Sequence, residues 1–227
     1  MAVNLRNTND VSISGVKLLV YGAAGAGKTY LIKTLPDPII LSAEAGLLSI
    51  RGSNLPYIGI KTMADLREAY GWLASSEEAK AFQSVALDSI SEIAEVVLGT
   101  EKAQSKDPRQ AYGAMQDIMT ALIRDFRDLP GRHVYFSAKV DKQQNELGQL
   151  LYSPSMPGQK LGQMLPYFFD EVLALRLGAN ENGETQRALQ CVSDGIWTAK
   201  DRSGKLDMWE PADLSKIIEK IGGQNNE

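Results

Sequence analysis

Residues 22–29, GAAGAGKT, have the types and the spacing of a phosphate-binding loop. They match the pattern G-x-x-x-x-G-K-[ST] without a mismatch. Apolar residues at 17–21 predict a strand before the loop, and residues 30–35 predict a helix after it. Backbone N–H groups at the start of that helix would face an anion, while Lys28 reaches its phosphates and Thr29 a Mg²⁺ ion. The predicted phosphate-contacting residues are Gly22, Ala23, Ala24, Gly25, Ala26, Gly27, Lys28, Thr29 and Tyr30.

Two acidic residues follow short apolar strands and could complete this site. Glu44 comes after the predicted strand 39–43, and Asp88 ends the predicted strand 84–88. The carboxyl ends of parallel strands form the ligand-binding edge of an open α/β sheet, so both acids can face the loop. Asp88 fits a Walker B pattern, in which an Asp holds Mg²⁺ beside the hydroxyl residue of the loop. For Glu44 the pattern leaves two interpretations open: an acid that faces the nucleotide, or an N-cap or first-turn acid of the segment 45–50.

Composition narrows the other chemistry that the chain can perform. Its 227 residues are 44% hydrophobic, which is enough to bury the core of one α/β domain. The single cysteine, Cys191, excludes an intramolecular disulfide, and with the single histidine, His133, it is too little for a zinc site. A net charge of -4 gives no overall basic surface, so nucleic acid would need a local patch. No signal peptide or membrane-spanning apolar run is evident, which predicts a soluble cytoplasmic protein.

Alternating elements form the framework that must position these residues. Further strands are predicted at 56–60, 133–138, 168–177 and 186–192, and helices at 63–74, 91–98 and 112–129, with a terminal helix opening at 211. This order predicts an α/β fold: a mostly parallel central sheet with helices on both faces and an antiparallel C-terminal addition. We expect a flexible arm at 1–14, one domain at 15–221 and a polar tail at 222–227.

Three polar segments interrupt the framework. Residues 99–110 are polar and locally basic and are predicted to project from the body. Residues 141–160 lack apolar periodicity and are predicted to be a structureless ligand loop, with a solvated connection as the alternative. The segment 197–206 places Lys200, Arg202 and Lys205 around a glycine-containing turn. That turn is either a solvated hairpin tip or a cationic finger that reaches a neighbouring subunit's phosphate site.

Taken together, these features make the chain resemble the RecA-like recombinase core, in the reduced form that bacteriophages encode as ATP-dependent single-strand annealing proteins. The resemblance spans about residues 16–211. It rests on the phosphate loop, the strand ending at Glu44, the strand ending at Asp88 and Ser89, and the strand 134–138 with its long following loop. It implies a P-loop NTPase of RecA-like type.

The resemblance also implies roles for individual residues. Glu44 would position or activate the attacking water, which favours the catalytic interpretation. Lys139 stands where the bacterial recombinase has a γ-phosphate-sensing Gln, and with Lys28 and Glu44 it completes the predicted catalytic set. The cations near the C-terminal hairpin would make phosphate contacts between subunits. The two polar loops would bind DNA through Lys102, Lys106, Arg109, Lys142 and Lys160.

The expected function is a Mg²⁺-dependent ATPase that assembles as a filament or ring on single-stranded DNA and promotes annealing or recombination. Its cofactors would be ATP and Mg²⁺, and its partners single-stranded DNA, other copies of itself and a single-strand DNA-binding protein, with no membrane. If the chain is phage-encoded, its compartment is the cytoplasm of a bacterial host. The alternative is a nucleotide-switched accessory module that binds a protein. A kinase is disfavoured because residues 141–160 contain no arginine for a phosphate lid.

Overall fold

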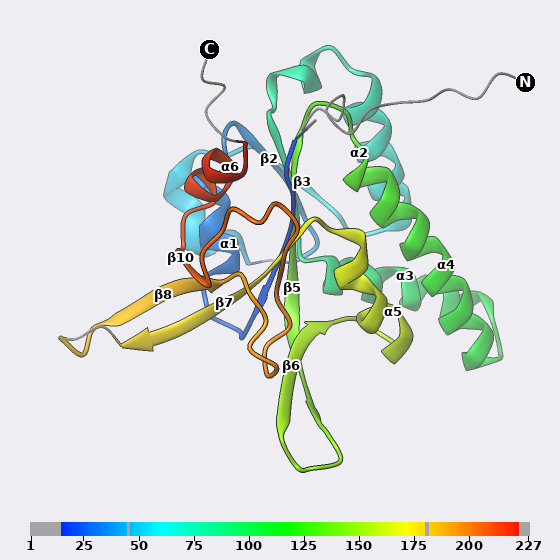
Figure 1. Cartoon of the computed structure of the whole chain (residues 1–227). Coiled ribbons are helices and arrows are strands. Elements are labelled where there is room, and N and C mark those ends of the chain that lie inside the picture. The colour runs from blue at the N-terminus through cyan, green and yellow to red at the C-terminus, as the bar shows by residue number, and fades with distance from the viewer. Residues whose placement is uncertain (1–14, 45, 180–181, 223–227) are drawn as a thin grey trace, which may run out of the picture.

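A computed structural model describes residues 15–44, 46–179 and 182–222 (Figure 1). The expected arm at 1–14 lies outside the described residues, as does the expected tail beyond Gly222. In chain order the main elements are β1 (Lys17–Gly22), α1 (Lys28–Leu31), β2 (Pro38–Ser42), β3 (Tyr57–Gly59), α2 (Met63–Ser75), β4 (Ser84–Asp88), α3 (Ile90–Gln104), α4 (Pro108–Arg127), β5 (His133–Gln144), β6 (Leu150–Ser155), α5 (Gln159–Met164), β7 (Glu171–Ala179), β8 (Thr185–Gln190), β9 (Lys200–Asp201), β10 (Trp209–Pro211) and α6 (Leu214–Gly222).

A single sheet organises the molecule, in the order β10-β8-β7-β1-β5-β4-β2-β3. The strands from β7 to β3 pair in parallel, whereas β8 and β10 add antiparallel strands at one edge. β6 pairs antiparallel with the outer part of β5, and β9 with the start of β7. The predicted fold class, a mostly parallel α/β sheet with an antiparallel C-terminal addition, is therefore confirmed.

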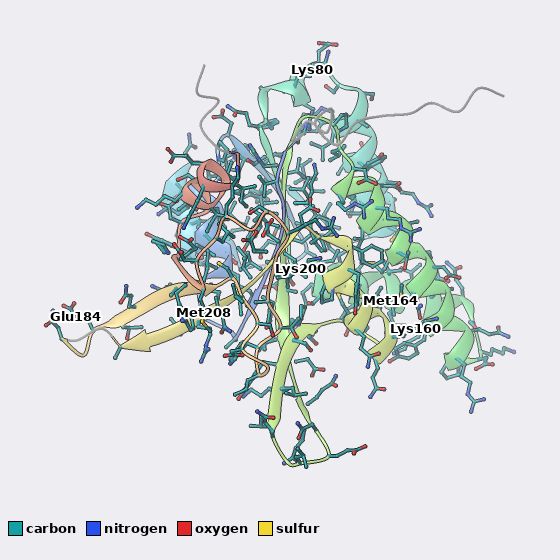
Figure 2. All side chains as sticks on the ribbon, in the orientation of Figure 1. Lys80, Lys160, Met164, Glu184, Lys200 and Met208 are labelled. Atoms are coloured by element: carbon teal, nitrogen blue, oxygen red, sulfur yellow. The ribbon has the colours of Figure 1, made fainter. Side chains whose placement is uncertain are left out.

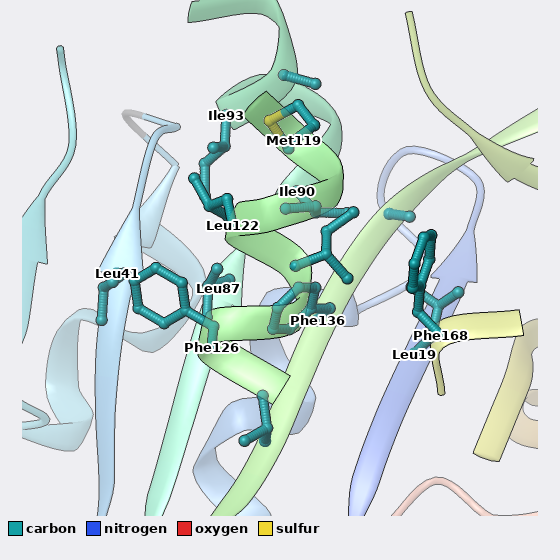
Figure 3. Close-up of a cluster of buried hydrophobic side chains, with 14 of the residues drawn as sticks. Leu19, Leu41, Leu87, Ile90, Ile93, Met119, Leu122, Phe126, Phe136 and Phe168 are labelled. Carbon is teal, nitrogen blue, oxygen red and sulfur yellow. The ribbon is translucent and has the colours of Figure 1, made fainter. Parts of the chain in front are cut away.

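Both faces of the sheet are covered, so its central strands are apolar on both sides (Figure 1). In β1, Leu19 and Tyr21 belong to the core beneath α2, α3 and α4, while Leu18 and Val20 belong to the core beneath α1 and α6. Figure 3 shows the larger core, where Phe126 of α4 lies close to side chains of the sheet. No helix in the described ranges is long and apolar enough to cross a membrane.

The prediction that residues 99–110 project as a polar insert is wrong. The helix α3 continues to Gln104 and α4 begins at Pro108, so only three residues join the two helices. The Asp107 side chain caps α4 by accepting from the Arg109 N–H at 2.9 Å, and proline occupies the first turn, where its missing N–H costs nothing. The polar residues and the proline are thus the signals of a helix end and a helix start.

The prediction of a structureless loop at 141–160 is also wrong. Beyond the sheet, β5 continues to Gln144 and pairs with β6 in an antiparallel hairpin, from Lys139 opposite Ser155 to Gln144 opposite Leu150. Its turn is closed by the Asn145 N–H, which donates to the Gln149 carbonyl at 3.0 Å. The outer hairpin residues have solvent on both sides, so no alternation of apolar and polar residues marks them as a strand.

Candidate nucleotide-binding site

The loop after β1 has the backbone geometry that phosphate binding requires. Gly25 and Gly27 have φ values of 76° and 105°, in a region that residues with a Cβ rarely adopt. A Cβ on Gly22 would lie 2.7 Å from the Leu175 carbonyl oxygen, so glycine also lets the loop pack closely against β7. The helix α1 begins at Lys28, within the loop motif, and the first N–H groups of a helix have no partner inside it, so they are available to an anion there.

Lys28 is held inside the loop. Its Nζ donates to the carbonyl oxygens of Gly22 at 2.8 Å and Ala23 at 3.0 Å. Burial lowers the pKa of Lys28, and the nearby carboxylates of Asp88 and Glu44 oppose that shift. These neutral carbonyls are weaker acceptors than phosphate oxygens, so an incoming phosphate can replace them as the partner of the ammonium.

Thr29 and Asp88 meet as the metal-site prediction requires. Thr29 Oγ1 donates to Asp88 Oδ2 at 2.8 Å, and Ser137 of β5 donates to Asp88 Oδ1. Burial raises the pKa of Asp88, while the hydrogen bonds from Ser137 and Thr29 lower it. A hydroxyl and a carboxylate are oxygen donors that suit Mg²⁺, an ion that keeps several waters and takes few protein ligands. The described residues contain no cluster of three or more His, Cys, Asp or Glu able to hold a metal ion.

Glu44 lies beside this pair because β2 is the neighbour of β4, with Ser42 opposite Asp88. Its Oε1 accepts from Ser89 Oγ at 2.7 Å, and its own carbonyl accepts from Ser42 Oγ at 2.8 Å. The 3₁₀ segment that follows, Leu47–Ser53, has Gly46 at its N-cap and no acid in its first turn. Glu44 is therefore neither the N-cap residue nor a first-turn acid of this segment.

Lys139 is at the point where β5 leaves the sheet. Its Nζ forms an ion pair with Glu92 at the start of α3, which raises the pKa of Lys139. Its backbone N–H donates to Ser91 Oγ at 3.0 Å, and Ser91 Oγ donates in turn to the Ser155 carbonyl of β6 at 2.7 Å. Lys139 is thus tied to α3 and the hairpin while it faces the site.

These residues line one cavity of about 810 Å³. Its walls are formed by Gly22, Ala24, Gly25, Gly27, Lys28, Thr29, Tyr30, Glu44, Gly46, Ser49, Asp88, Lys139, Val140 and Arg187. The predicted catalytic residues and metal ligands are therefore brought together. Arg187 of β8 and Ser137 were not predicted. Each reaches the site through the sheet, from a position more than 100 residues from the phosphate loop, and no local pattern marks either one.

The three cations predicted to act between subunits lie elsewhere. Lys200 Nζ donates to the Pro166 carbonyl at 2.8 Å, Arg202 pairs with Asp170 at 2.7 Å, and Lys205 Nζ donates to the Ile221 carbonyl at 2.7 Å. Their turn adjoins β9, which pairs with the first residues of β7, whereas the phosphate loop follows the last residue of the parallel strand β1. Arg202 and Lys205 therefore sit toward the opposite end of the sheet from the loop, whereas Lys200 lines a different cavity together with Asp141 of the β5–β6 hairpin. A contact of any of the three with a neighbouring subunit stays a prediction.

Part of the predicted DNA-binding set converges. Arg109 of α4 and Lys160 of α5 line a groove of about 580 Å³ together with Tyr112 (Figure 2 labels Lys160). Lys102 of α3 lies over the Tyr112 ring, with Nζ 5.2 Å from its centroid. Lys142 is on the β5–β6 hairpin with Nζ 5.8 Å from the Tyr152 ring, and Lys106 is exposed in the α3–α4 connection.

The fold and this site define a P-loop NTPase domain, with an α/β sheet of RecA-like type. The chain belongs to the family AAA_24, described as an AAA domain, whose model matches residues 14–203. Among solved structures it is similar to a KaiC-like protein from the hyperthermophilic archaeon Pyrococcus horikoshii, at 15% sequence identity and a TM-score of 0.43, over 78% of this chain and 77% of that one. No curated protein matches the chain.

Proposed function

We propose that the protein is a Mg²⁺-dependent ATPase that assembles on single-stranded DNA and promotes annealing or recombination. The observation that carries the hydrolytic part is the position of Glu44, a half-buried carboxylate held by Ser89 in the same cavity as Lys28 and the Thr29–Asp88 pair. A carboxylate next to the terminal phosphate can orient a water molecule and accept its proton.

In the proposed mechanism, each group of residues in the cavity has its own role in phosphoryl transfer. Loop N–H groups and Lys28 bind the phosphates and stabilise charge that develops on them. Thr29 and Asp88 would hold Mg²⁺, which when bound neutralises phosphate charge and orients the β and γ phosphates. Glu44 positions the water, and Ser89 orients Glu44 by donating to Oε1.

ATP turnover by purified protein tests this assignment. We expect Lys28→Ala to lose nucleotide binding and Glu44→Gln to retain it while turnover falls by about 10²-fold or more, as when a positioned general base is removed. Arg67→Ala, at an exposed position on α2, is the control and should turn over normally. Unchanged turnover in Glu44→Gln would leave the nucleotide site in place but remove the hydrolytic function.

The groove between α4 and α5 supports the DNA part of the proposal. Single strands are bound by cations that follow the backbone and by aromatic rings on which bases stack. The groove combines Arg109 and Lys160 with Tyr112, which is 39% exposed, and Lys102 adjoins it. This local set compensates for the net charge of -4, which disfavours DNA over the surface as a whole.

DNA dependence is tested by measuring turnover and oligonucleotide binding at two salt concentrations. We expect single-stranded DNA to stimulate turnover at low salt and the effect to weaken as salt rises. Tyr112→Ala should weaken DNA binding by about tenfold, the usual scale for one stacked base, whereas Lys216→Ala on α6 should not. Absence of any DNA effect at either salt would favour the alternative, a nucleotide-switched module whose partner is a protein.

A further inference from the structure

Among the described residues that line the nucleotide cavity, Arg187 is a cation that neither the motifs nor the mechanism above explains. It lies on β8, and its Nε donates to the Ala26 carbonyl of the phosphate loop at 2.9 Å. Gly27 makes this contact possible, since a Cβ there would lie 2.8 Å from Nε and 3.2 Å from Cδ of Arg187. An arginine from the C-terminal hairpin is therefore fitted against the loop on which the phosphates must rest.

The hairpin reaches the loop because it extends past the end of β1. The last register pair between β1 and β7 is Tyr21 with Ala174, so β7 continues beyond the sheet edge from Leu175. Arg187 pairs with Leu177 in this extension. Figure 1 shows β7 and β8 leaving the body as a two-stranded arm, and Figure 2 places Glu184 toward its tip. Arg187 occupies the base of that arm, next to the loop.

Strand order then separates the cavity into two ends. Asp88 and Glu44 come from β4 and β2, which lie on the β5 side of β1, whereas Arg187 comes from β8 on the β7 side. The reacting phosphate must lie near Glu44, so the rest of the nucleotide extends away from the β4 side. Tyr30 and Arg187 line the cavity beyond the loop.

We propose that Arg187 contacts the nucleoside end of the bound nucleotide, with its guanidinium plane against the purine base. The contact deepens the proposed function and rests on the nucleotide site being where the loop places it. The guanidinium suits this role because it is planar, always charged and able to stack on aromatic faces. Its bond to Ala26 is made by Nε, which fixes the plane and leaves the two terminal nitrogens beyond it. Purines offer a larger π face than pyrimidines, so Arg187 would also favour purine nucleotides.

Binding without hydrolysis tests the proposal on the full-length protein. Dissociation constants for ADP, CDP and inorganic pyrophosphate, each with Mg²⁺, are measured by calorimetry for the wild type, Arg187→Ala, Arg187→Lys and the control Arg67→Ala. We expect Arg187→Ala to weaken ADP binding by about threefold to fivefold, the scale of a cation–π contact made by an exposed arginine. Pyrophosphate binding should stay within about twofold, because it has no base to lose. The preference for ADP over CDP should shrink.

Each alternative outcome has a defined meaning. Arg187→Lys keeps the charge and loses the plane, so it should resemble Arg187→Ala for ADP. If lysine restores ADP affinity, or if pyrophosphate weakens as much as ADP, Arg187 contacts a phosphate and the base assignment is overturned. Unchanged ADP binding in Arg187→Ala overturns the contact altogether. Lys28→Ala, measured alongside, tests the nucleotide site itself. If this variant binds ADP normally, the nucleotide does not bind at the phosphate loop.

Discussion

At the scale of single residues, two buried acids of the sheet differ in their surroundings: Asp88 in the nucleotide cavity and Glu171 outside it. Asp88 is 2% exposed and accepts hydrogen bonds from Thr29 and Ser137, which favour its charged form against the cost of burial. Glu171 at the start of β7 is equally buried, at 1% exposed, but its Oε2 has no hydrogen-bond partner among the described residues. Burial, reinforced by the neighbouring Asp201, raises the pKa of Glu171 to about 8. Burial raises the pKa of both carboxyl groups, but hydrogen bonds from Ser137 and Thr29 oppose that shift at Asp88, whereas the neighbouring Asp201 reinforces it at Glu171.

The raised pKa of Glu171 predicts a pH-dependent stability. In the folded protein Glu171 keeps its proton up to about pH 8, whereas in the unfolded chain it ionises near the ordinary glutamate pKa of 4.5. The folded state binds more protons over that interval, so this group's contribution to stability falls as pH rises from about 4.5 to 8 and is constant above. Glu171→Gln cannot ionise, and its amide can replace the protonated carboxyl as the side-chain hydrogen-bond partner of Asp201. We expect it to flatten the pH dependence of the denaturation midpoint and to stabilise the protein at pH 8 by up to a few kcal/mol.

Denaturant unfolding at pH 5 and pH 8 measures this effect. Glu68→Gln, at an exposed position on α2, is the control for loss of one carboxylate. Equal destabilisation of Glu171→Gln at both pH values would mean that the carboxyl is ionised in the folded protein and held by contacts with its anion.

At the scale of elements, local sequence patterns predicted what is built from consecutive residues. The phosphate loop is contiguous, and the strands that end at Asp88 and precede Glu44 are buried on both sides, so they appear as short apolar runs. The β5–β6 hairpin was missed because its exposed outer residues have no buried face. Ser137 and Arg187 were missed because their roles depend on strand order: β5 adjoins β4, and β8 reaches past β1 through β7. Residues that become neighbours only across a sheet have no characteristic spacing in the sequence.

Lys139 of β5 pairs with Glu92 of α3 and is linked through Ser91 to β6. Its ion pair predicts how a bound nucleotide could influence the β5–β6 hairpin. The ammonium lines the nucleotide cavity but is paired with Glu92. A γ-phosphate would compete with Glu92 for it, and the backbone of Lys139 is linked through Ser91 to β6. We expect Lys139→Ala to weaken ATP binding relative to ADP by about threefold to tenfold, as for loss of a partly exposed charge-assisted hydrogen bond. Glu92→Gln, which removes the competitor, should strengthen ATP binding relative to ADP.

The opposite signs of these two variants make the test specific. A nonhydrolysing background of Glu44→Gln allows ATP and ADP affinities to be compared by calorimetry. Oligonucleotide anisotropy then reports coupling: Lys139→Ala should lose the effect of ATP on DNA binding, whereas Lys142→Ala on the hairpin should weaken DNA binding with and without ATP. If Glu92→Gln weakens ATP as Lys139→Ala does, the pair supports the fold of the site and does not respond to nucleotide.

At the scale of the whole molecule, the nucleotide cavity joins parts that are otherwise separate. Its lining comes from the loop after β1, the ends of β2, β4 and β5, and the arm formed by β7 and β8. Lys200, Arg202 and Lys205 do not line this cavity in the described part of the chain, and each is held by a contact elsewhere. A nucleotide held by one chain would stabilise that chain alone, whereas a nucleotide held between chains would also stabilise their assembly.

This difference predicts how nucleotide-linked stability depends on protein concentration. Ligand at about 100 times its Kd stabilises a folded protein by about 2.7 kcal/mol, which raises Tm by about 5–10 °C for a chain of this size. We expect Mg²⁺ and ADP to raise Tm by this amount at every protein concentration, and Mg²⁺ with ATP in the Glu44→Gln background to raise it further as protein concentration increases.

Arg202→Ala, which frees Asp170 at the surface, should remove only the concentration-dependent part if Arg202 contacts the neighbour's phosphates. Sedimentation under the same conditions supplies the control, because assembly must appear where the extra stabilisation does. A Tm shift with ATP that is independent of protein concentration, with a single sedimenting species, would place the whole nucleotide site within one chain and remove the reason to assign Lys200, Arg202 or Lys205 to it.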